Sequence, residues 1–395
     1  MSTVSERRTP RLTAVMREGE RVTPLELFFD LVFVLALTQC TTLMARTPTW
    51  EGLLKGLLAL GMLWWSWGGY AWLTSVIDPE EGTVRLAMFA AMAALLVAAL
   101  GVPGAFGSEA LLFACAYGVV RAAHIVLFTI ASRDDAALRR SVTGLAISTA
   151  IGVGLLVVAA FTHGALQLCL WALALALDTG GPYLFGADGW KLVPGHFAER
   201  HGLIVLIALG ESIVALGVGA KVVLDTGIVV AAVLGVVVAA TLWWVYFDVT
   251  AIVAERRLSQ TKEGRERNEM ARDSYSYLHF LMIAGIALLA VGMKITLEDV
   301  NGSLKLVPAA ALLGGAALYL LAHVAFRLRN MHTLGTRRLV CAIVLMALVP
   351  VTVALGLSSL LTLGVLAVIL TALIAYEALR YADARERVRH QAASR

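Results

Sequence analysis

Two carboxylates lie four residues apart at the start of an apolar run, in the segment LELFFDLVFVLALTQ (Leu25–Gln39). In a helix, positions i and i+4 share one face, so Glu26 and Asp30 would point to the same side. A charge inside a membrane costs roughly 2.5–3.5 kcal/mol on insertion scales, so such residues almost always face protein or water. This pattern is typical of a site that binds a cation or carries a proton.

The two acids have different alternatives. Negative charge is favoured at a helix N-terminus, and we interpret Glu26 first as a cap of this helix. Asp30 lies deeper, between Phe29 and Phe33, and we interpret it as a functional carboxylate.

A third acid, Glu211, lies about midway along the apolar run 202–220. Ala208 and Ser212 share its helical face, and small residues at such spacings let a neighbouring helix approach closely. Glu211 should therefore point into the helix bundle. It is either a functional carboxylate or a structural clamp between helices.

One basic residue, Arg121, lies at the midpoint of the apolar run 109–131. A buried arginine requires a partner, and Glu211 is the acid that we place at the same depth. The sequence therefore predicts an Arg121–Glu211 pair. The pair is either fixed architecture or a gate.

Other titratable residues fall at the depth of Glu26 and Asp30. Asp248 lies near the end of the run 226–253, and His201 and His323 are placed at a similar level. Carboxylates and imidazoles that converge there would form a water-filled vestibule for a cation or a proton.

The elements that position these residues are membrane helices. Of the 395 residues, 59% are hydrophobic and only 15% are charged, whereas soluble domains carry about 25% charged residues. A span needs about 20 apolar residues, and it must be helical because lipid offers the backbone no hydrogen-bonding partner. We expect an all-α polytopic membrane protein with about twelve transmembrane helices. Their predicted ranges are 26–46, 53–77, 84–103, 109–131, 141–161, 164–185, 202–220, 226–253, 273–294, 304–327, 336–356 and 358–379.

The two halves of the sequence show internal similarity. Leu31–Gln39 aligns with Leu203–Glu211, and further matches follow in the same order along the chain. We therefore predict two six-helix repeats. An even number of spans gives them the same orientation, and in transporters of this build the site usually lies between the halves. The predicted segments are a basic leader (1–24), the first repeat (25–178), a cytoplasmic linker (179–201), the second repeat (202–380) and a cytoplasmic tail (381–395).

Basic residues set the predicted orientation. Most of the 32 Lys and Arg residues fall in segments that are cytoplasmic if the N-terminus is inside, which matches the positive-inside rule. We expect a multi-pass protein of the bacterial inner membrane with both termini in the cytoplasm. The net charge of +4 then reflects topology, and we expect the lipid bilayer and a small solute or ion, not nucleic acid, as partners.

Other chemistry is sparse. The sequence has no closely spaced His/Asp ligand set, and its four cysteines show no C-x-x-C spacing. We expect no cofactor and no metal, and we assign no catalytic residue. The sequence leaves the oligomeric state open.

Two motifs carry a resemblance. ELFFDLVFVLALTQ (Glu26–Gln39) and HFAERHGLIVLIALGESIVALG (His196–Gly217) are similar to the signatures of the bacterial low temperature requirement A family. The resemblance implies a polytopic inner-membrane protein linked to growth in the cold, without a settled molecular activity. It also implies that eight positions of the two motifs are family features: Glu26, Phe29, Asp30, Glu199, His201, Gly210, Glu211 and Ser212.

Three functions fit these observations. The first is a secondary transporter or a cation or proton pathway, with Glu211 and Asp30 as the coupling carboxylates. The second is a membrane-embedded enzyme that acts on a lipid or isoprenoid through Asp30, Asp248 and nearby histidines. The third is a structural or sensing protein in which the charges only hold helices together.

Overall fold

The computed structural model describes residues 21–184, 189–219, 225–383 and 385–387. Most of the predicted leader and the end of the predicted tail lie outside these residues. The described chain folds into helices, with an isolated β-bridge between Ser303 and Ser358. The all-α prediction is thus confirmed.

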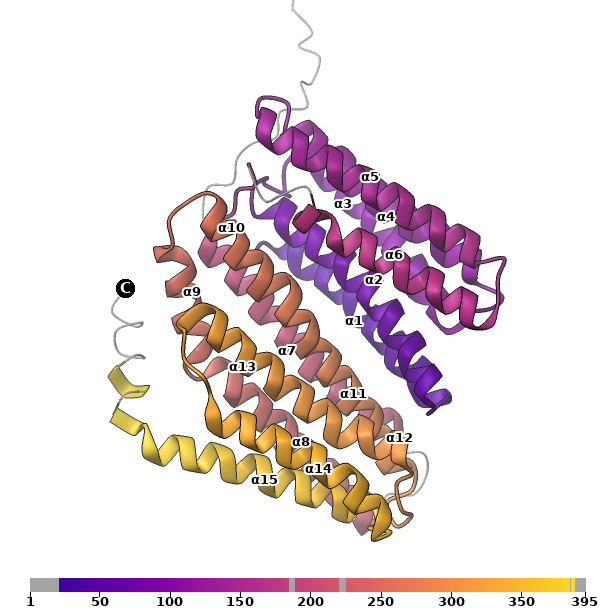
Figure 1. Cartoon of the computed structure of the whole chain (residues 1–395), viewed down its shortest axis with the longest axis vertical. Helices are drawn as coiled ribbons and strands as arrows, with labels where there is room; N and C mark the ends of the chain where they lie inside the picture. The colour runs from indigo at the N-terminus through magenta and orange to yellow at the C-terminus, as the bar shows by residue number, and fades with distance from the viewer. Residues whose placement is uncertain (1–20, 185–188, 220–224, 384, 388–395) are drawn as a thin grey trace, which may run out of the picture.

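The helices form two groups that lie side by side (Figure 1). The first group holds α1 (Pro24–Arg46), α2 (Trp50–Thr74), α3 (Gly82–Gly101), α4 (Ala110–Ala131), α5 (Ala136–Ala159) and α6 (Gly164–Leu184). The second holds α7 (Pro194–Gly219), α8 (Thr226–Phe247), α9 (Thr250–Gln260), α10 (Arg265–Ala271), α11 (His279–Glu298), α12 (Leu306–Ala309), α13 (Gly315–Met331), α14 (Thr336–Ala354) and α15 (Ser359–Arg380). The short helix η1 (Val102–Gly104) and the π-helices η2 (Arg272–Leu278) and η3 (Ala310–Gly314) extend α3, α10 and α12.

Ten helical segments in the described chain are long and apolar enough to cross a membrane. This finding confirms a polytopic membrane fold. Two further long helices, α2 with 25 residues and α7 with 26, fall outside that set. The count of twelve spans therefore stays a prediction.

The beginning of α1 follows directly from its sequence. Thr23 is the N-cap, Pro24 occupies the first turn, and Glu26 completes a capping box with Thr23. Proline suits this position because it has no backbone N–H to leave unpaired. The two buried acids of α1 are thus fixed at the beginning of a helix whose position along the chain is well defined.

The two groups pack in a similar order. α1 packs on α2 and α3, while α7 packs on α8 and α11, and each group continues through successive neighbouring helices. The groups meet where α1 and α2 contact α7 and α11 (Figure 1). This order agrees with the predicted repeats, which stay a prediction.

The core of the second group depends on close backbone contact. A Cβ atom added at Gly292 would come within 2.5 Å of the Leu312 backbone, and one at Gly315 within 2.5 Å of the Leu289 nitrogen. Small residues allow such approach in membranes, where packing replaces the hydrophobic effect between helices. α11 is therefore held tightly against η3 and α13.

Two polar stretches between the predicted spans are partly helical. α6 continues to Leu184 and α7 begins at Pro194, so the connection between them is shorter than the predicted linker 179–201. The polar stretch 254–272 is also largely helical, in α9 and α10, because Ala254, Leu258 and Met270 are buried against the second group.

Candidate functional site

Four ionisable side chains meet where the two groups of helices touch. Glu26 and Asp30 come from α1, and His196 and Arg200 come from α7, again at i and i+4. All four side chains have 0% exposure. We call these four residues the α1–α7 charge cluster.

Arg200 joins both carboxylates. Its Nη2 donates to Asp30 Oδ1 at 2.5 Å, and its Nη1 donates to Glu26 Oε1 at 3.2 Å and to Thr74 Oγ1 at 3.0 Å. The Trp67 indole Nε1 also donates to Asp30 Oδ1, at 2.7 Å. The planar guanidinium suits this task because its fixed donors can reach two acids at once.

Glu26 has two roles. Its Oε2 accepts from the Thr23 backbone N–H at 2.9 Å, which caps α1, while its Oε1 lies 2.8 Å from His196 Nε2. The predicted cap is therefore present, and the same carboxylate also reaches across to α7. The cap interpretation and the site interpretation do not exclude each other.

The charge cluster sets two carboxylates against a single permanently charged base, Arg200. His196 changes this balance with its protonation: one negative charge is in excess when the imidazole is neutral, and the four charges cancel when it is protonated. Asp30 Oδ2 is buried and has no hydrogen-bond partner among the described residues. An uncompensated buried charge is costly, so a proton or a cation at this place would bring the cluster to neutrality.

His201 lies beside the cluster in an aromatic cage. Its ring packs within 5.1 Å of Trp67 and 5.3 Å of His279, measured between ring centroids. Its Nδ1 lies 2.8 Å from the Phe197 carbonyl, to which it donates, and its Nε2 has no partner in the described part of the chain. His279 continues the row toward Tyr246, whose hydroxyl lies 2.8 Å from His279 Nε2.

Glu211 lies further along the same two helices. Thr38 of α1 donates to it at 2.6 Å and Thr41 at 3.4 Å, and its side chain is 3% exposed. The interface between α1 and α7 therefore carries buried acids at two positions along the helix axes, which we call its two levels. Glu211 points into the bundle as predicted.

The predicted Arg121–Glu211 pair is wrong, because Arg121 has another acid. Its Nη2 donates to Asp178 Oδ1 of α6 at 2.8 Å and to Thr149 Oγ1 of α5 at 2.9 Å. Tyr117 and Thr149 also donate to Asp178. The prediction failed because Asp178 was placed at a repeat boundary, whereas α6 carries it well inside the first group.

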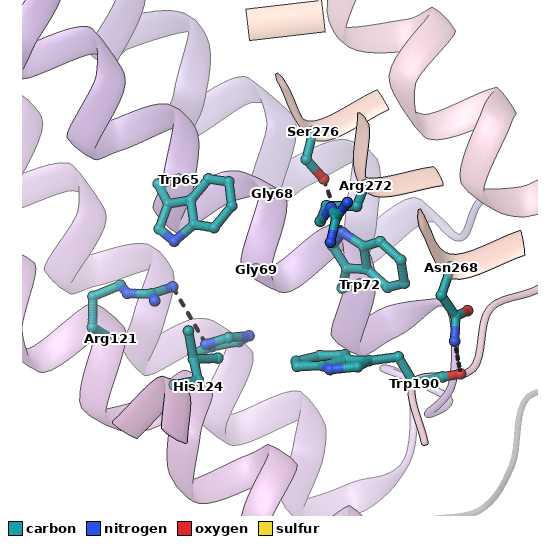
Figure 2. A pocket seen from close by; sticks show the side chains of 11 residues that line it. Trp65, Gly68, Gly69, Trp72, Arg121, His124, Trp190, Asn268, Arg272 and Ser276 are labelled. Atoms are coloured by element: carbon teal, nitrogen blue, oxygen red, sulfur yellow. Dashed lines mark hydrogen bonds between the residues drawn. The ribbon is translucent and has the colours of Figure 1, made fainter. Parts of the chain in front are cut away.

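A small cavity lies next to Arg121 (Figure 2). Its volume is about 50 Å³, enough for water. Arg121 and His124 reach it from α4, across Gly68 and Gly69 of α2 and opposite Trp72 (Figure 2). A Cβ atom at Gly69 would lie 2.9 Å from the His124 ring, so glycine makes room for these two side chains.

Asp248 and His323 do not join the α1–α7 charge cluster. Asp248 accepts two hydrogen bonds from Arg385, at 2.5 and 2.8 Å. Arg338 Nη1 lies 2.9 Å from His323 Nδ1, and Arg338 also donates to Glu377 at 2.7 and 2.9 Å. The predicted vestibule is thus divided, because Asp248 and His323 interact with α14 and the segment after α15 and, among the described residues, not with α1.

Sequence reasoning missed three residues that complete the buried pairs: His196, Arg200 and Asp178. A signal existed for the first two, since they stand four residues apart in HFAERH and match the spacing of Glu26 and Asp30. They were overlooked because that segment was assigned to a solvated linker. In the described chain no three His, Cys, Asp or Glu side chains are grouped to hold a metal ion.

Comparisons with known proteins agree with the membrane fold. The family described as bacterial low temperature requirement A protein (LtrA) matches residues 21–375. An uncharacterized protein of Rhizobium meliloti (strain 1021) is 29% identical over 310 residues, covering 75% of this chain and 74% of the relative. No solved structure matches.

Proposed function

The chain belongs to the bacterial low temperature requirement A family, and we propose that it forms a proton or cation pathway between its two groups of helices. The α1–α7 charge cluster is the coupling site of this pathway. The observation that carries the proposal is a fully buried cluster in which two carboxylates share one guanidinium and a titratable imidazole.

The position of the cluster supports this function. In transporters built from repeated halves, substrates and coupling ions bind where the halves meet. Glu26 and Asp30 belong to one group of helices, and His196 and Arg200 belong to the other. Adding or removing one charge therefore changes the attraction between the groups, which is the kind of change that a transport cycle requires.

Asp30 Oδ2 is the atom best suited to hold the transported proton. Its other oxygen accepts from Arg200 and Trp67, while Oδ2 itself has no partner among the described residues. Arg200 stays charged throughout, since guanidinium groups are not deprotonated in proteins. A proton on Asp30 leaves one carboxylate, Glu26, facing one guanidinium.

A second level along the interface supports a pathway through the membrane. Glu211 meets Thr38 and Thr41 beyond a stretch of buried apolar residues on the same two helix faces. That stretch comprises Phe33, Leu37, Ile204 and Ala208. Apolar constrictions gate pathways by excluding water, so a conformational change that hydrates this stretch would connect the two levels.

The enclosure of the charge cluster favours transport over catalysis. An enzyme that acts on a lipid or isoprenoid needs an opening through which its substrate reaches the acids, and all four cluster side chains have 0% exposure. A proton needs no such opening in the resting state. We therefore propose the pathway ahead of the enzyme.

Flux measurements test the proposal. Purified protein in proteoliposomes should move protons or K⁺ down an imposed gradient, and Asp30→Asn should abolish this flux. Asn keeps the shape of Asp30 and leaves Arg200 paired with Glu26, so thermal stability should hold. Glu298→Gln is the matched control, because Glu298 is an exposed acid at the end of α11 and does not belong to the cluster. Equal flux in Asp30→Asn and the native protein would refute the assignment, as would a native protein without flux.

The orientation of the chain is part of this proposal. Both termini lie in the cytoplasm, in agreement with the distribution of basic residues. Reporter fusions after Gln260 should read cytoplasmic, and fusions after Pro103 should read periplasmic. The same compartment for both fusions would contradict this topology.

A further inference from the structure

A second pocket lies away from the α1–α7 charge cluster, at the ends of five helices of the second group. Its volume is about 320 Å³. It is formed by the end of α8, the beginning of α9, the end of α13, the beginning of α14 and the end of α15. These ends lie on one side of the second group (Figure 1), at the termini of segments that can span the membrane. The pocket is therefore near the membrane surface.

Arginine dominates the charge of this pocket. Its lining holds Arg327, Arg337, Arg338 and Arg385 but only two acids, Asp248 and Glu377. The acids are already bound, Asp248 to Arg385 at 2.5 Å and Glu377 to Arg338 at 2.7 Å. Two guanidinium groups, those of Arg327 and Arg337, remain without a carboxylate partner among the described residues.

Arg327 is the less usual of the two. Its Nε is buried and has no hydrogen-bond partner in the described part of the chain. A buried N–H donor without a partner destabilises the fold, and more so when the group is charged. A protein that keeps such a group at the wall of a pocket has a donor available for an anion.

Arg337 is held in place by aromatic rings. Its guanidinium carbon lies 4.7 Å from the ring centroid of Tyr376, and its Nη1 donates to the Tyr381 hydroxyl at 2.5 Å. These contacts orient the side chain without neutralising it. An arginine fixed in this way loses little freedom when it binds an anion.

We propose that this pocket binds a phosphate group through Arg327 and Arg337. Phosphate matches the site because guanidinium groups donate paired hydrogen bonds to its oxygens, and its negative charge offsets the two unpaired arginines. The phosphate is carried either by a lipid headgroup or by a soluble molecule. Leu334 lines the pocket, and Leu379 follows the lining residue Glu377 on α15. These two leucines are 53% and 84% exposed and offer an apolar surface to lipid tails.

The test uses the full-length protein in nanodiscs of phosphatidylcholine. One arm adds inorganic phosphate against sodium chloride of equal ionic strength, and the other replaces part of the lipid with phosphatidic acid. The midpoint of thermal unfolding is the readout. We expect at least one probe to raise the midpoint of the native protein, and Arg327→Gln/Arg337→Gln to weaken the apparent affinity at least ten-fold.

Two further variants make the result decisive. Arg380→Gln is the matched control, since Arg380 is an exposed arginine at the end of α15 that does not line the pocket, and it should respond like the native protein. If the double variant does not fold, Arg337→Gln alone serves, because Arg337 is exposed.

Each outcome has a meaning. A response to inorganic phosphate supports a soluble ligand, and a response to phosphatidic acid alone supports a lipid headgroup. The proposal is overturned if neither probe stabilises the native protein, if the double variant responds fully, or if Arg380→Gln loses the response equally.

Discussion

Arg200 and Arg121 are both buried arginines in a membrane protein, and their surroundings differ in two respects. Arg121 faces one carboxylate, Asp178, and every partner of that pair lies within the first group of helices. Arg200 faces two carboxylates, and it joins α7 to α1 across the interface between the groups. The Arg121–Asp178 pair is balanced within one group of helices, whereas the α1–α7 charge cluster sets two carboxylates against one guanidinium between the two groups.

This difference separates architecture from function. A balanced pair can hold helices together indefinitely, and apolar residues of similar volume can often replace it. A cluster of two carboxylates, one guanidinium and one imidazole has charge states that differ by a proton, so it can respond to its surroundings. We therefore assign the Arg121–Asp178 pair to stability and the α1–α7 charge cluster to the pathway.

The largest expected effect follows from Arg200→Met. It leaves Glu26 and Asp30 buried without their shared guanidinium, and loss of one partner from a buried ion pair costs about 3–5 kcal/mol. We expect little folded protein, measured as the monodisperse fraction in size-exclusion chromatography. Arg329→Met, which removes a partly exposed arginine, is the control. Normal folding of Arg200→Met would mean that the acids do not need the arginine.

The balanced pair should behave differently in a double-mutant cycle. Arg121→Met and Asp178→Leu should each cost about 3–5 kcal/mol, because each leaves one buried charge alone. The double variant should recover much of that loss, since no charge remains. Additive losses would show that the two residues do not interact.

Smaller effects should follow from the neutral donors of each cluster. Trp67→Phe removes the indole donor to Asp30, and Tyr117→Phe removes the hydroxyl donor to Asp178. Hydrogen bonds to charged groups contribute about 1.5–3 kcal/mol, so the midpoint of thermal unfolding should fall in both variants. Only Trp67→Phe should also alter the pH dependence of flux. Equal pH profiles in the two variants would remove the distinction between the clusters.

The smallest expected effect on stability belongs to Glu211→Gln. Gln keeps an oxygen that can accept from Thr38, and Glu211 has no ion pair among the described residues that a neutral amide would break. Flux should nevertheless fall if Glu211 forms the second level of the pathway. Unchanged flux would restrict Glu211 to clamping α1 against α7.

The sequence predicted the fold class because hydropathy is a local property, and long apolar stretches in lipid must be helical. It identified Glu26, Asp30 and Glu211 because acids inside apolar runs are conspicuous. Pairing is not local, however. Arg121 was assigned to Glu211 because similar depth does not specify which neighbouring helix lies closest, and Asp178 was placed at a boundary.

The sequence did not identify Arg200 as a site residue, for a related reason. Its segment is polar, so composition alone assigned it to a solvated linker, and only tertiary packing shows that α7 begins at Pro194 and buries His196 and Arg200 completely. Asp248 and His323 were grouped with Asp30 because the position of a residue along its span gives its depth in the membrane. It does not say which helices are neighbours in the membrane plane.

One comparison tests the central claim most directly: flux and thermal stability of Asp30→Asn and Asp178→Asn, measured side by side in proteoliposomes. Both variants remove one negative charge from a buried acid next to an arginine. We predict that Asp30→Asn loses flux and keeps its unfolding midpoint, because Glu26 still compensates Arg200. Asp178→Asn should lose stability, because Arg121 is left unpaired, and its folded fraction should keep flux. Loss of stability in Asp30→Asn with flux intact would contradict the account.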